Sequence, residues 1–380
     1  MISAGKFWIG IGFSVAFLAL FFLTVDVNEM ANSLAGANYI FLAPAIIAYL
    51  VSVLFRTLRW RVLLRHMKPV STRRLYPVVT IGYMANAILP MRLGEIVRSY
   101  YIGEREGISK TSALATIFIE RVLDALTLLF FMAAIALFVP LSGLAQAFGD
   151  RSGLAWPFLV AVFSAPFLVA FVTLLLFAAY PDQTKAVSRA FVRPLPQRFE
   201  TPIRDMVEYL LRGLIPLRNP RTITHLFLLS IPIWLLEALL FFFIALSFDL
   251  HLAFPGIGQM AVGMVLVTAI ANIGSSIPAA PGGIGLFELI TRETLVLLPL
   301  ASVDRSVAAG FATLTHATLI LPMILLGQVF LWTGHISLRK LTKAGKANAE
   351  LVNSSAQTPS GSADGAGRTT TQVAEDGRAR

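Results

Sequence analysis

The sequence predicts an all-α, polytopic helical membrane protein with about six full spans and two broken or re-entrant helical elements. Of its 380 residues 56% are hydrophobic and only 14% are charged, which is too apolar for a soluble domain. Several uncharged runs reach the roughly 20 residues that a helix needs to cross a bilayer. Two further apolar segments are interrupted by Asn, Pro, Gly and Glu in the same order. We therefore expect six to eight transmembrane helices.

Six apolar runs are long enough for full spans: about residues 7–25, 39–57, 112–139, 154–179, 223–247 and 306–333. The first run follows Lys6, as a secretory signal would. Asp26 and Glu29 come after it instead of a small-residue cleavage site, so we interpret it as a retained helix. Residues 341–380 are polar and rich in Ser, Gly, Ala and Thr. They are predicted to be a disordered cytoplasmic tail behind a transmembrane domain at 1–340.

Lys and Arg are concentrated in some of the segments between the apolar runs. Residues 56–74 hold seven, 91–110 hold four, 181–222 hold eight and the chain after 333 holds seven. Residues 26–38 and 248–258 hold none, and 140–153 and 301–305 hold one each. Because basic loops stay on the cytoplasmic side, the charges predict a multi-pass protein of the cytoplasmic membrane with both termini cytoplasmic.

The two remaining apolar regions, about 77–90 and 259–299, contain the breaks. Basic segments flank 77–90, and its 14 residues would reach only about 21 Å as a helix, so we expect a re-entrant hairpin from the cytoplasmic side. Region 259–299 starts and ends on the external side of the membrane, so it either is re-entrant or crosses the membrane twice. The units 39–139 and 223–333 then have opposite orientations, which predicts an inverted repeat with a site near the midplane.

Both breaks are predicted from residues that stop a helix or free its backbone. They are Asn86, Pro90 and Gly94 in the first break, and Asn272, Pro278, Pro281, Gly282, Gly283 and Gly285 in the second. At membrane depth such breaks need covering protein or a water-filled cavity. We interpret the two Asn residues as partners of freed backbone groups. The second break is either a tight turn or an exposed apex that meets a ligand.

Charged residues follow the first break. Arg92, Glu95 and Arg98 have i, i+3 spacing, which places them on one face of a helix. One interpretation is a solvated basic face at the membrane interface. The other is an anion clamp, in which one carboxylate orients two guanidinium groups that bind a phosphate headgroup.

A second charged cluster lies inside the span 112–139. Glu120, Arg121 and Asp124 are costly there and are expected to face a cavity or a partner. They form either a structural ion pair, with Arg121 reaching Asp124, or the wall of a polar pathway, which we favour. Glu237, alone in the middle of its span, is expected to line a cavity or to pair with an arginine.

The second break is followed by Glu288 and Arg292, which are expected to pair at i, i+4 and to complete the substrate site. His316 is interpreted as a packing hydrogen bonder rather than a ligand. The five histidines are scattered and cysteine is absent, so no metal site and no cofactor is predicted. No nucleotide-binding motif occurs, and the net charge of +10 suits an anionic membrane leaflet rather than nucleic acid.

Three motifs resemble the transmembrane domain of lysylphosphatidylglycerol synthases, a flippase-like family of membrane proteins. They are Asn86-x-x-Leu89-Pro90-x-Arg92-x-Gly94-Glu95-x-x-Arg98, Glu120-Arg121-x-x-Asp124 and Pro278-x-x-Pro281-Gly282-Gly283-x-Gly285-x-x-Glu288. The resemblance covers about residues 5–340. It implies movement of an amphiphilic lipid across the membrane, of the phospholipid, glycolipid, polyprenyl-phosphate or hopanoid type. Lysyl transfer, which a separate soluble domain performs in bifunctional relatives, is not expected here.

The sequence therefore predicts a protein that binds and translocates a lipid and is a transporter rather than an enzyme. Two alternatives stay open: a membrane enzyme that transfers a group onto a lipid carrier, and a non-catalytic assembly factor. The expected partners are the lipid substrate and anionic lipids of the cytoplasmic leaflet. A second copy of the chain or a lipid-biosynthesis enzyme would be the protein partner.

Overall fold

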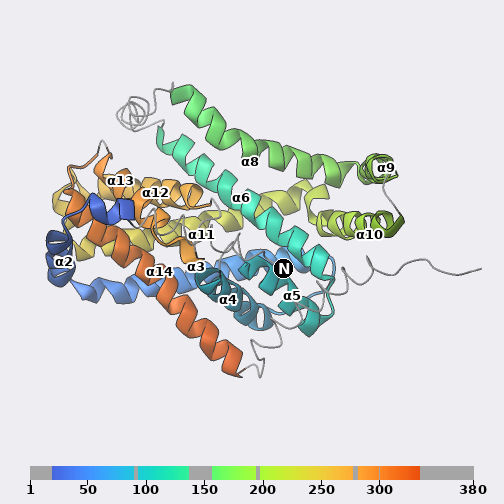
Figure 1. The fold of residues 1–380 in the computed structure, drawn as a ribbon, viewed down its shortest axis with the longest axis horizontal. Helices are drawn as coiled ribbons and strands as arrows, with labels where there is room; N and C mark the ends of the chain where they lie inside the picture. The colour runs from blue at the N-terminus through green and yellow to red at the C-terminus, as the bar shows by residue number, and fades with distance from the viewer. Residues whose placement is uncertain are drawn as a thin grey trace, which may run out of the picture.

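The computed structural model describes residues 19–89, 93–136, 156–193, 197–276, 281–298 and 300–333. These residues form helices and turns, with no strand among them, which confirms the predicted all-α membrane fold (Figure 1). The first predicted span is described only from residue 19. Three residues of the predicted breaks and site, namely Pro90, Arg92 and Pro278, and the tail 341–380 lie outside the described residues.

The helices in chain order are α2 (Val27–Gly36), α3 (Leu42–Leu64), α4 (Thr72–Ile88), α5 (Gly94–Glu106), α6 (Lys110–Ala136), α8 (Trp156–Ala179), α9 (Pro181–Val192), α10 (Gln197–Gly213), α11 (Pro220–Ser247), α12 (Ile257–Gly274), α13 (Leu286–Val296) and α14 (Arg305–Thr333). Among the described residues, four segments are long and apolar enough to cross a membrane: Tyr39–Leu64, Pro220–Ser247, Ile257–Gly274 and Arg305–Thr333. Helix α6 has a similar length but carries the predicted cluster of three charges.

Helix α3 is longer than predicted. The span expected to end at residue 57 continues to Leu64, so Arg56 and Arg59 lie inside the helix rather than in a basic loop. Both side chains are buried. The charge pattern suggested a loop because arginines are rare in spans, and the structure shows instead that they have partners inside the protein.

The first broken element is a re-entrant helical hairpin made of α4 and α5, which we call the first hairpin. Lys68, just before α4, donates to the carbonyl of Glu106, the last residue of α5, at 2.8 Å. Both outer ends therefore lie together. The predicted hairpin at 77–90 was too short, because α5 was counted among the basic loops. Helix α4 has 17 residues and reaches about 25 Å, less than the roughly 30 Å of the hydrocarbon core.

The second broken element, the second hairpin, consists of α12 and α13. Phe254 before α12 and Leu298 after α13 both pack beside Gly263, within 4 Å of the place where a Cβ would lie. The outer ends of both arms are thus neighbours. Neighbouring outer ends suit a re-entrant element and a pair of crossings alike, but the 11 residues of α13 reach only about 17 Å, well short of the roughly 30 Å hydrocarbon core. The length of α13 therefore favours a re-entrant element over a pair of crossings.

The long helices α3 and α11 run in opposite directions. Asn38, before α3, donates its backbone N–H to the carbonyl of Ser247, the last residue of α11, at 2.8 Å. At the other end His66, after α3, contacts the carbonyl of Arg212, ahead of α11, at 2.8 Å. We call the end that holds His66 and Lys68 the basic end, and the end that holds Asn38 the opposite end.

The two hairpins enter from different ends. The first opens at the basic end, where Lys68 meets Glu106. The second leads into α14, whose Ser306 donates to Glu29 of α2 at 3.0 Å, close to Asn38 at the opposite end. Helices α3–α6 and α11–α14 therefore form two units of opposite orientation.

The packing between these units is symmetric. Helix α3 packs on α11, α4 packs on α14, and α12 packs on α6. Within each unit the two arms of the hairpin contact one another, and the second arm contacts the last helix. This arrangement confirms the predicted inverted repeat. Helices α8, α9 and α10 lie along the outer side of α6 in Figure 1.

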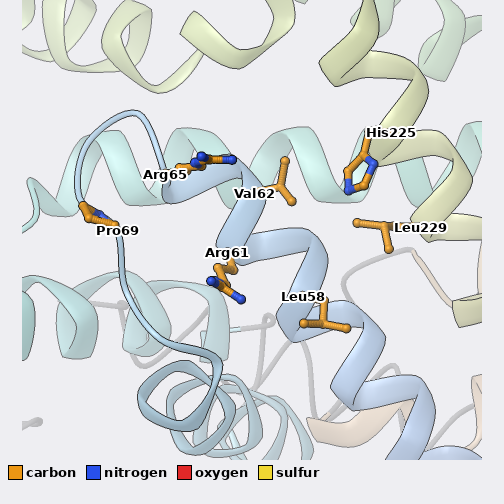
Figure 2. A pocket seen from close by; sticks show the side chains of 7 residues that line it. All are labelled: Leu58, Arg61, Val62, Arg65, Pro69, His225 and Leu229. Atoms are coloured by element: carbon orange, nitrogen blue, oxygen red, sulfur yellow. The ribbon is translucent and has the colours of Figure 1, made fainter.

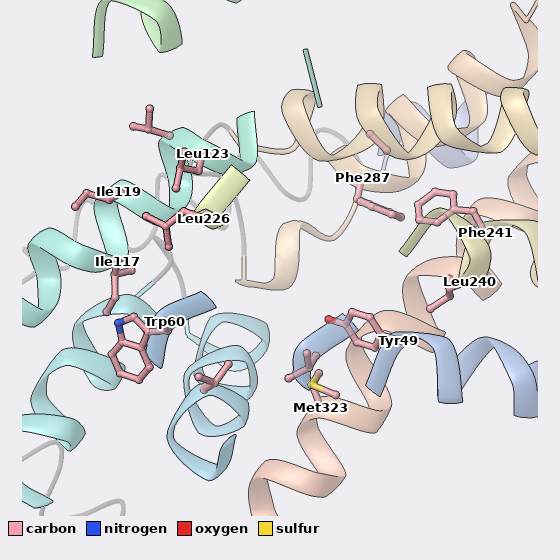
Figure 3. Close-up of a cluster of buried hydrophobic side chains, with 14 of the residues drawn as sticks. Tyr49, Trp60, Ile117, Ile119, Leu123, Leu226, Leu240, Phe241, Phe287 and Met323 are labelled. Atoms are coloured by element: carbon pink, nitrogen blue, oxygen red, sulfur yellow. The ribbon is translucent and has the colours of Figure 1, made fainter. Parts of the chain in front are cut away.

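A buried apolar core joins the units. Figure 3 shows its labelled side chains in two groups, one around Trp60 and Ile117 and one around Tyr49, Phe241 and Met323. Tyr49 and Trp60 both belong to α3, so this helix contributes to both groups. Its pairing with α11 consequently fixes where the charged residues of α3 lie.

Candidate functional site

Two arginines of α3 form the centre of a buried ionic network. Arg56 binds Glu237 of α11 at 2.5 Å, and its other terminal nitrogen lies 3.7 Å from Asp124 of α6. Arg59 binds Asp124 at 2.8 Å and Ser230 of α11 at 2.7 Å. These contacts join the first helix of each unit to α6.

The first hairpin joins the same network through Arg98 of α5. Its guanidinium binds Glu120 of α6 at 2.7 Å and stacks over the ring of Trp60, 3.7 Å from the ring centroid. Arg59 lies 3.9 Å from the same carboxylate. Arg98, predicted to clamp a headgroup, is thus already held by a protein carboxylate and an aromatic ring.

The buried part of the network is balanced in charge: three arginines (Arg56, Arg59 and Arg98) face three carboxylates (Glu120, Asp124 and Glu237). This balance lowers the cost of holding ions away from water. Five buried nitrogens of these arginines have no hydrogen-bond partner among the described residues: Arg56 Nε, Arg59 Nε and Nη2, and Arg98 Nε and Nη2. Buried donors of this kind normally bind water or a ligand.

Arg121 is the most accessible arginine of the cluster, with 28% of its side chain exposed. It contacts Asp124 at 3.2 Å, as predicted from their i, i+3 spacing, and lies 3.8 Å from Glu95 of α5. Because Glu95 is also partly exposed, this outer pair can exchange partners at less cost than the buried pairs.

A cavity of about 190 Å³ lies beside the network, between the inner ends of the two hairpins. We call the described residues 86–89 and 93–94 the first tip and the described residues 275–276 and 281–285 the second tip. The polar side chains lining the cavity are Tyr49, Arg56, Tyr83, Asn86, Arg121, Glu237, Asn272, Ser275 and His316. Both units contribute to its wall, as the inverted repeat predicts.

The first tip is closed by Asn86. Its side-chain oxygen accepts the backbone N–H of Gly94 at 2.7 Å, which confirms that this Asn satisfies a freed backbone group. Gly94 also allows α4 and α5 to touch, because a Cβ there would lie 2.0 Å from the carbonyl oxygen of Gly82. The sequence of this break therefore determines how closely the two arms cross.

The second tip is held to α14 by His316. One ring nitrogen lies 2.7 Å from the carboxylate of Glu288, and the other lies 2.9 Å from the carbonyl of Gly282. The second carboxylate oxygen accepts the N–H of Gly285 at 2.7 Å. Gly282, Gly283 and Gly285 have φ values of +66°, +75° and +89°, a region that favours glycine.

The two contacts of His316 restrict where hydrogen atoms can lie on its ring and on Glu288. A carbonyl oxygen only accepts hydrogen bonds, so the nitrogen facing Gly282 carries a hydrogen. The short contact between the other nitrogen and Glu288 then needs one further proton, on either the ring or the carboxyl group. Both contacts can be hydrogen bonds only if the pair holds one proton more than a neutral imidazole beside a carboxylate. His316 was predicted to be a packing hydrogen bonder, which these two contacts confirm, whereas its place in the cavity wall was not predicted.

The two tips meet. A Cβ at Gly282 would lie 3.2 Å from the carbonyl oxygen of Ala87, near the end of α4. The second hairpin also joins the ionic network, because Asn272 donates to Glu237 at 2.9 Å and to the carbonyl of Thr268 at 3.0 Å. Asn272 thus contacts a carbonyl inside α12 rather than a backbone group freed at the break, and it links a hairpin to a charged side chain.

The predicted pairing of Glu288 with Arg292 is wrong. Glu288 turns toward His316, whereas Arg292 binds Glu293 at 2.7 Å and the carbonyl of Phe21 at 3.0 Å. The i, i+4 rule describes an isolated helix, and here contacts with other parts of the chain decide both orientations. Arg292 thus attaches α13 to the segment before α2, away from the cavity lining.

The structure separates the predicted substrate residues into groups. Arg121 and Glu237 line the cavity, and the ionic network behind the cavity contains Glu95, Arg98, Glu120 and Asp124. Glu288 and Arg292 hold the second hairpin, whereas Arg92 lies outside the described residues. Arg56 and Arg59 were missed as site residues. Their i, i+3 spacing beside the aromatic Trp60 was the available signal, since it places both on one face of an apolar helix.

The fold and the site define a polytopic helical membrane protein in which two inverted units surround a polar cavity. The chain belongs to the family of the lysylphosphatidylglycerol synthase transmembrane region, whose model matches residues 7–327. This confirms the resemblance seen in the three motifs.

Relatives of this chain include membrane proteins and one enzyme. A UPF0104 membrane protein of Methanothermobacter thermautotrophicus is 25% identical over 308 residues, which are 78% of this chain and 86% of the relative. Glycosyltransferase AglD of Haloferax volcanii is 26% identical over 326 residues, 81% of this chain. The chain spans about half of that relative, 51% of its length. No solved structure matches.

Proposed function

We propose that this protein binds an amphiphilic lipid and moves its headgroup across the cytoplasmic membrane, through the cavity between the two tips. The observation that carries the proposal is that two re-entrant hairpins from opposite ends meet around one polar cavity. Inverted units of this kind suit alternating access, because rocking one unit against the other opens the same site to either side.

The charges of the cavity favour a particular headgroup. Two guanidinium groups, Arg56 and Arg121, line it together with one carboxylate, Glu237. The positive excess suits a phosphate, which planar guanidinium groups bind well. Glu237 and Asn272 can contact a hydroxyl or an amine of the same headgroup. We therefore propose a phosphate-bearing lipid whose headgroup also contains hydrogen-bond donors.

The size of the cavity supports transport of the headgroup alone. Its 190 Å³ is smaller than the roughly 300–1,000 Å³ of sites that enclose a drug-sized ligand. The acyl or isoprenoid chains would stay in the bilayer while the polar group crosses. On binding, the phosphate would replace Asp124 or Glu95 as a partner of Arg121, so that no arginine is left unpaired.

A flipping assay in liposomes tests this proposal. The purified protein is reconstituted with a fluorescent phospholipid, and the loss of fluorescence to a membrane-impermeant reductant gives the rate. Arg121→Gln and Glu237→Gln each remove a charge-assisted contact, worth about 1.5–3 kcal/mol, so the rate should fall roughly 10- to 100-fold. Arg92→Ala, in the predicted clamp, is expected to act in the same direction.

The matched controls are Arg73→Gln and Glu208→Gln, which remove the same charges from exposed positions. They should flip lipid as the unchanged protein does. Equal rates in all of these variants would contradict the assignment of the site. Flipping no faster than in protein-free liposomes, for every lipid tested, would contradict the function.

The relative named as a glycosyltransferase supports a second candidate, transfer of a group onto a lipid carrier. That relative is about twice as long as the matched region, so its activity can reside elsewhere in its chain. Incubation of the purified protein with donor and acceptor lipids separates the candidates: a transferase yields a covalently altered lipid, whereas a flippase only relocates it. An assembly factor would do neither, and neutralising these charges would then alter only expression.

We also propose that the basic end faces the cytoplasm. The chain contains no cysteine, so single cysteines can report on its orientation. Arg73→Cys marks the basic end and Asn28→Cys marks the opposite end, and both positions are exposed. In intact cells an impermeant maleimide should label only the second variant. Labelling of the first alone would reverse the proposed orientation.

A further inference from the structure

A second hollow lies on the outer surface, between α3 and α11 at the basic end. Its volume is about 530 Å³, within the range of small-molecule sites. Figure 2 shows the residues that form it: Leu58, Arg61 and Val62 from α3, Arg65 and Pro69 from the segment after α3, and His225 and Leu229 from α11. None of these lines the central cavity. We call this hollow the basic groove.

The arginines of the basic groove differ from those of the ionic network. Arg61 and Arg65 are exposed and stand one helical turn apart. Arg61 makes a long contact of 3.4 Å with the hydroxyl of Thr72, and neither arginine forms an ion pair with a carboxylate among the described residues. Like charges at i, i+4 repel, and an anion bound between them would relieve this repulsion. His225 adds a third group able to contact an anion from the facing helix.

The groove is also partly apolar. Leu58, Val62 and Leu229 form the remainder of its wall. Further along the same two helices, toward the middle of the molecule, Leu54 and Leu235 are exposed as well. The groove therefore lies where an apolar, lipid-facing surface passes into a basic one, which is the position of phospholipid headgroups at a membrane interface.

We propose that the basic groove binds a phospholipid with an anionic headgroup, separately from the transported lipid and independently of the proposed translocation. The phosphate bridges Arg61 and Arg65, and an acyl chain lies along Leu58, Val62 and Leu229. Charge complementarity favours this occupant, because both arginines lack a carboxylate partner among the described residues.

The position of the groove gives the bound lipid a structural effect. Leu58 and Leu229 are the chain neighbours of Arg59 and Ser230, whose side chains join α3 to α11 by a hydrogen bond of 2.7 Å. The lipid therefore covers the contact between the first helices of the two units. Its binding should raise the thermal stability of the protein, because a ligand that binds only the folded state stabilises it.

The test uses the full chain, purified and delipidated in a neutral detergent, and titrated with phosphatidylglycerol. Native mass spectrometry counts the bound lipids, and thermal unfolding reports on stability. Two charges near a membrane surface each contribute about 1 kcal/mol, so Arg61→Gln/Arg65→Gln should bind roughly 30-fold more weakly. The matched control Arg73→Gln/Arg74→Gln removes two exposed charges from the same end and should change the affinity less than about threefold.

Two other ligands distinguish the possible sources of the anion. Phosphatidylcholine should bind at least about tenfold more weakly than phosphatidylglycerol, since it carries no net negative charge. Inorganic phosphate should not raise the unfolding temperature at the lipid concentrations used. If both double variants bind phosphatidylglycerol equally weakly, the lipid is attracted by the basic surface as a whole and not by a site in the groove, which would overturn the proposal. Equal binding of the two lipids, or saturation by phosphate alone, would overturn the proposal.

Discussion

The two hairpins have the same architecture but are held by different chemistry. In each unit an acid–base pair joins the second arm of the hairpin to the last helix. In the first unit the base is on the hairpin and the acid on the last helix, Arg98 with Glu120 at 2.7 Å. In the second unit the order is reversed, Glu288 with His316 at 2.7 Å. The contact thus occupies the same place in both units, but the acid and the base are exchanged between the hairpin and the last helix.

This difference has a physical consequence for the tips. Arginine stays charged in proteins, so the Arg98–Glu120 pair holds the first hairpin without the gain or loss of a proton by its base. The base of the second pair is instead an imidazole, whose hydrogen bonds depend on which ring nitrogens carry hydrogen; one nitrogen contacts Glu288 and the other contacts the carbonyl of Gly282 in the second tip. We therefore expect the first hairpin to be the fixed element of the pair and the second to be the adjustable one.

The largest effect should come from breaking the fixed contact. Glu120→Leu leaves Arg98 buried without its carboxylate and weakens the contact with Arg59, so the free energy of unfolding should fall by about 3–5 kcal/mol. Denaturant unfolding in detergent measures it. The double variant Arg98→Met/Glu120→Leu removes both charges of the pair and should recover much of the loss. A double variant as unstable as the single one would show that the pair is not the cause.

The adjustable contact should give the next largest effect. His316→Ala removes the partner of the buried Glu288 carboxylate and of the half-buried carbonyl of Gly282, a loss of about 2–3 kcal/mol. Amide hydrogen exchange should become faster in residues 281–288 and stay unchanged in residues 82–89 of the first hairpin. Equal acceleration in both hairpins would indicate general unfolding and would remove the proposed distinction between them.

Local chemistry was predictable from the sequence, and distant partners were not. Asn86 and Gly94 identified the first break because their effects on the backbone are short in range. Arg56 was assigned to a loop, since its partner Glu237 is 181 residues away and no periodicity reports it. Glu237 itself was expected to line a cavity or to pair with an arginine, and it does both, although the sequence did not identify the arginine.

Charge counting correctly placed the openings of the two hairpins at opposite ends of the molecule, but it did not give the size of the hairpins. The segment 91–110 was treated as a basic loop, and most of it is α5, whose Arg98 is buried. A count of arginines cannot distinguish one that meets solvent from one that meets Glu120. The second hairpin had no such charges in its arms before Glu288, so its limits were closer to the prediction.

The smallest effect should come from the turn that shapes the second tip. Gly283 has a φ of +75° with no atom within 4 Å of an added Cβ, so Gly283→Ala costs only the strain of the left-handed backbone, about 1–2 kcal/mol. Gly94→Ala in the first hairpin should cost more, because its Cβ meets a backbone oxygen at 2.0 Å. Measuring the free energy of unfolding of both variants compares the cost of backbone strain in the second hairpin with the cost of a steric clash in the first. The reverse order of stability would mean that the arms of the first hairpin can separate readily, and the first hairpin would then be the adjustable element.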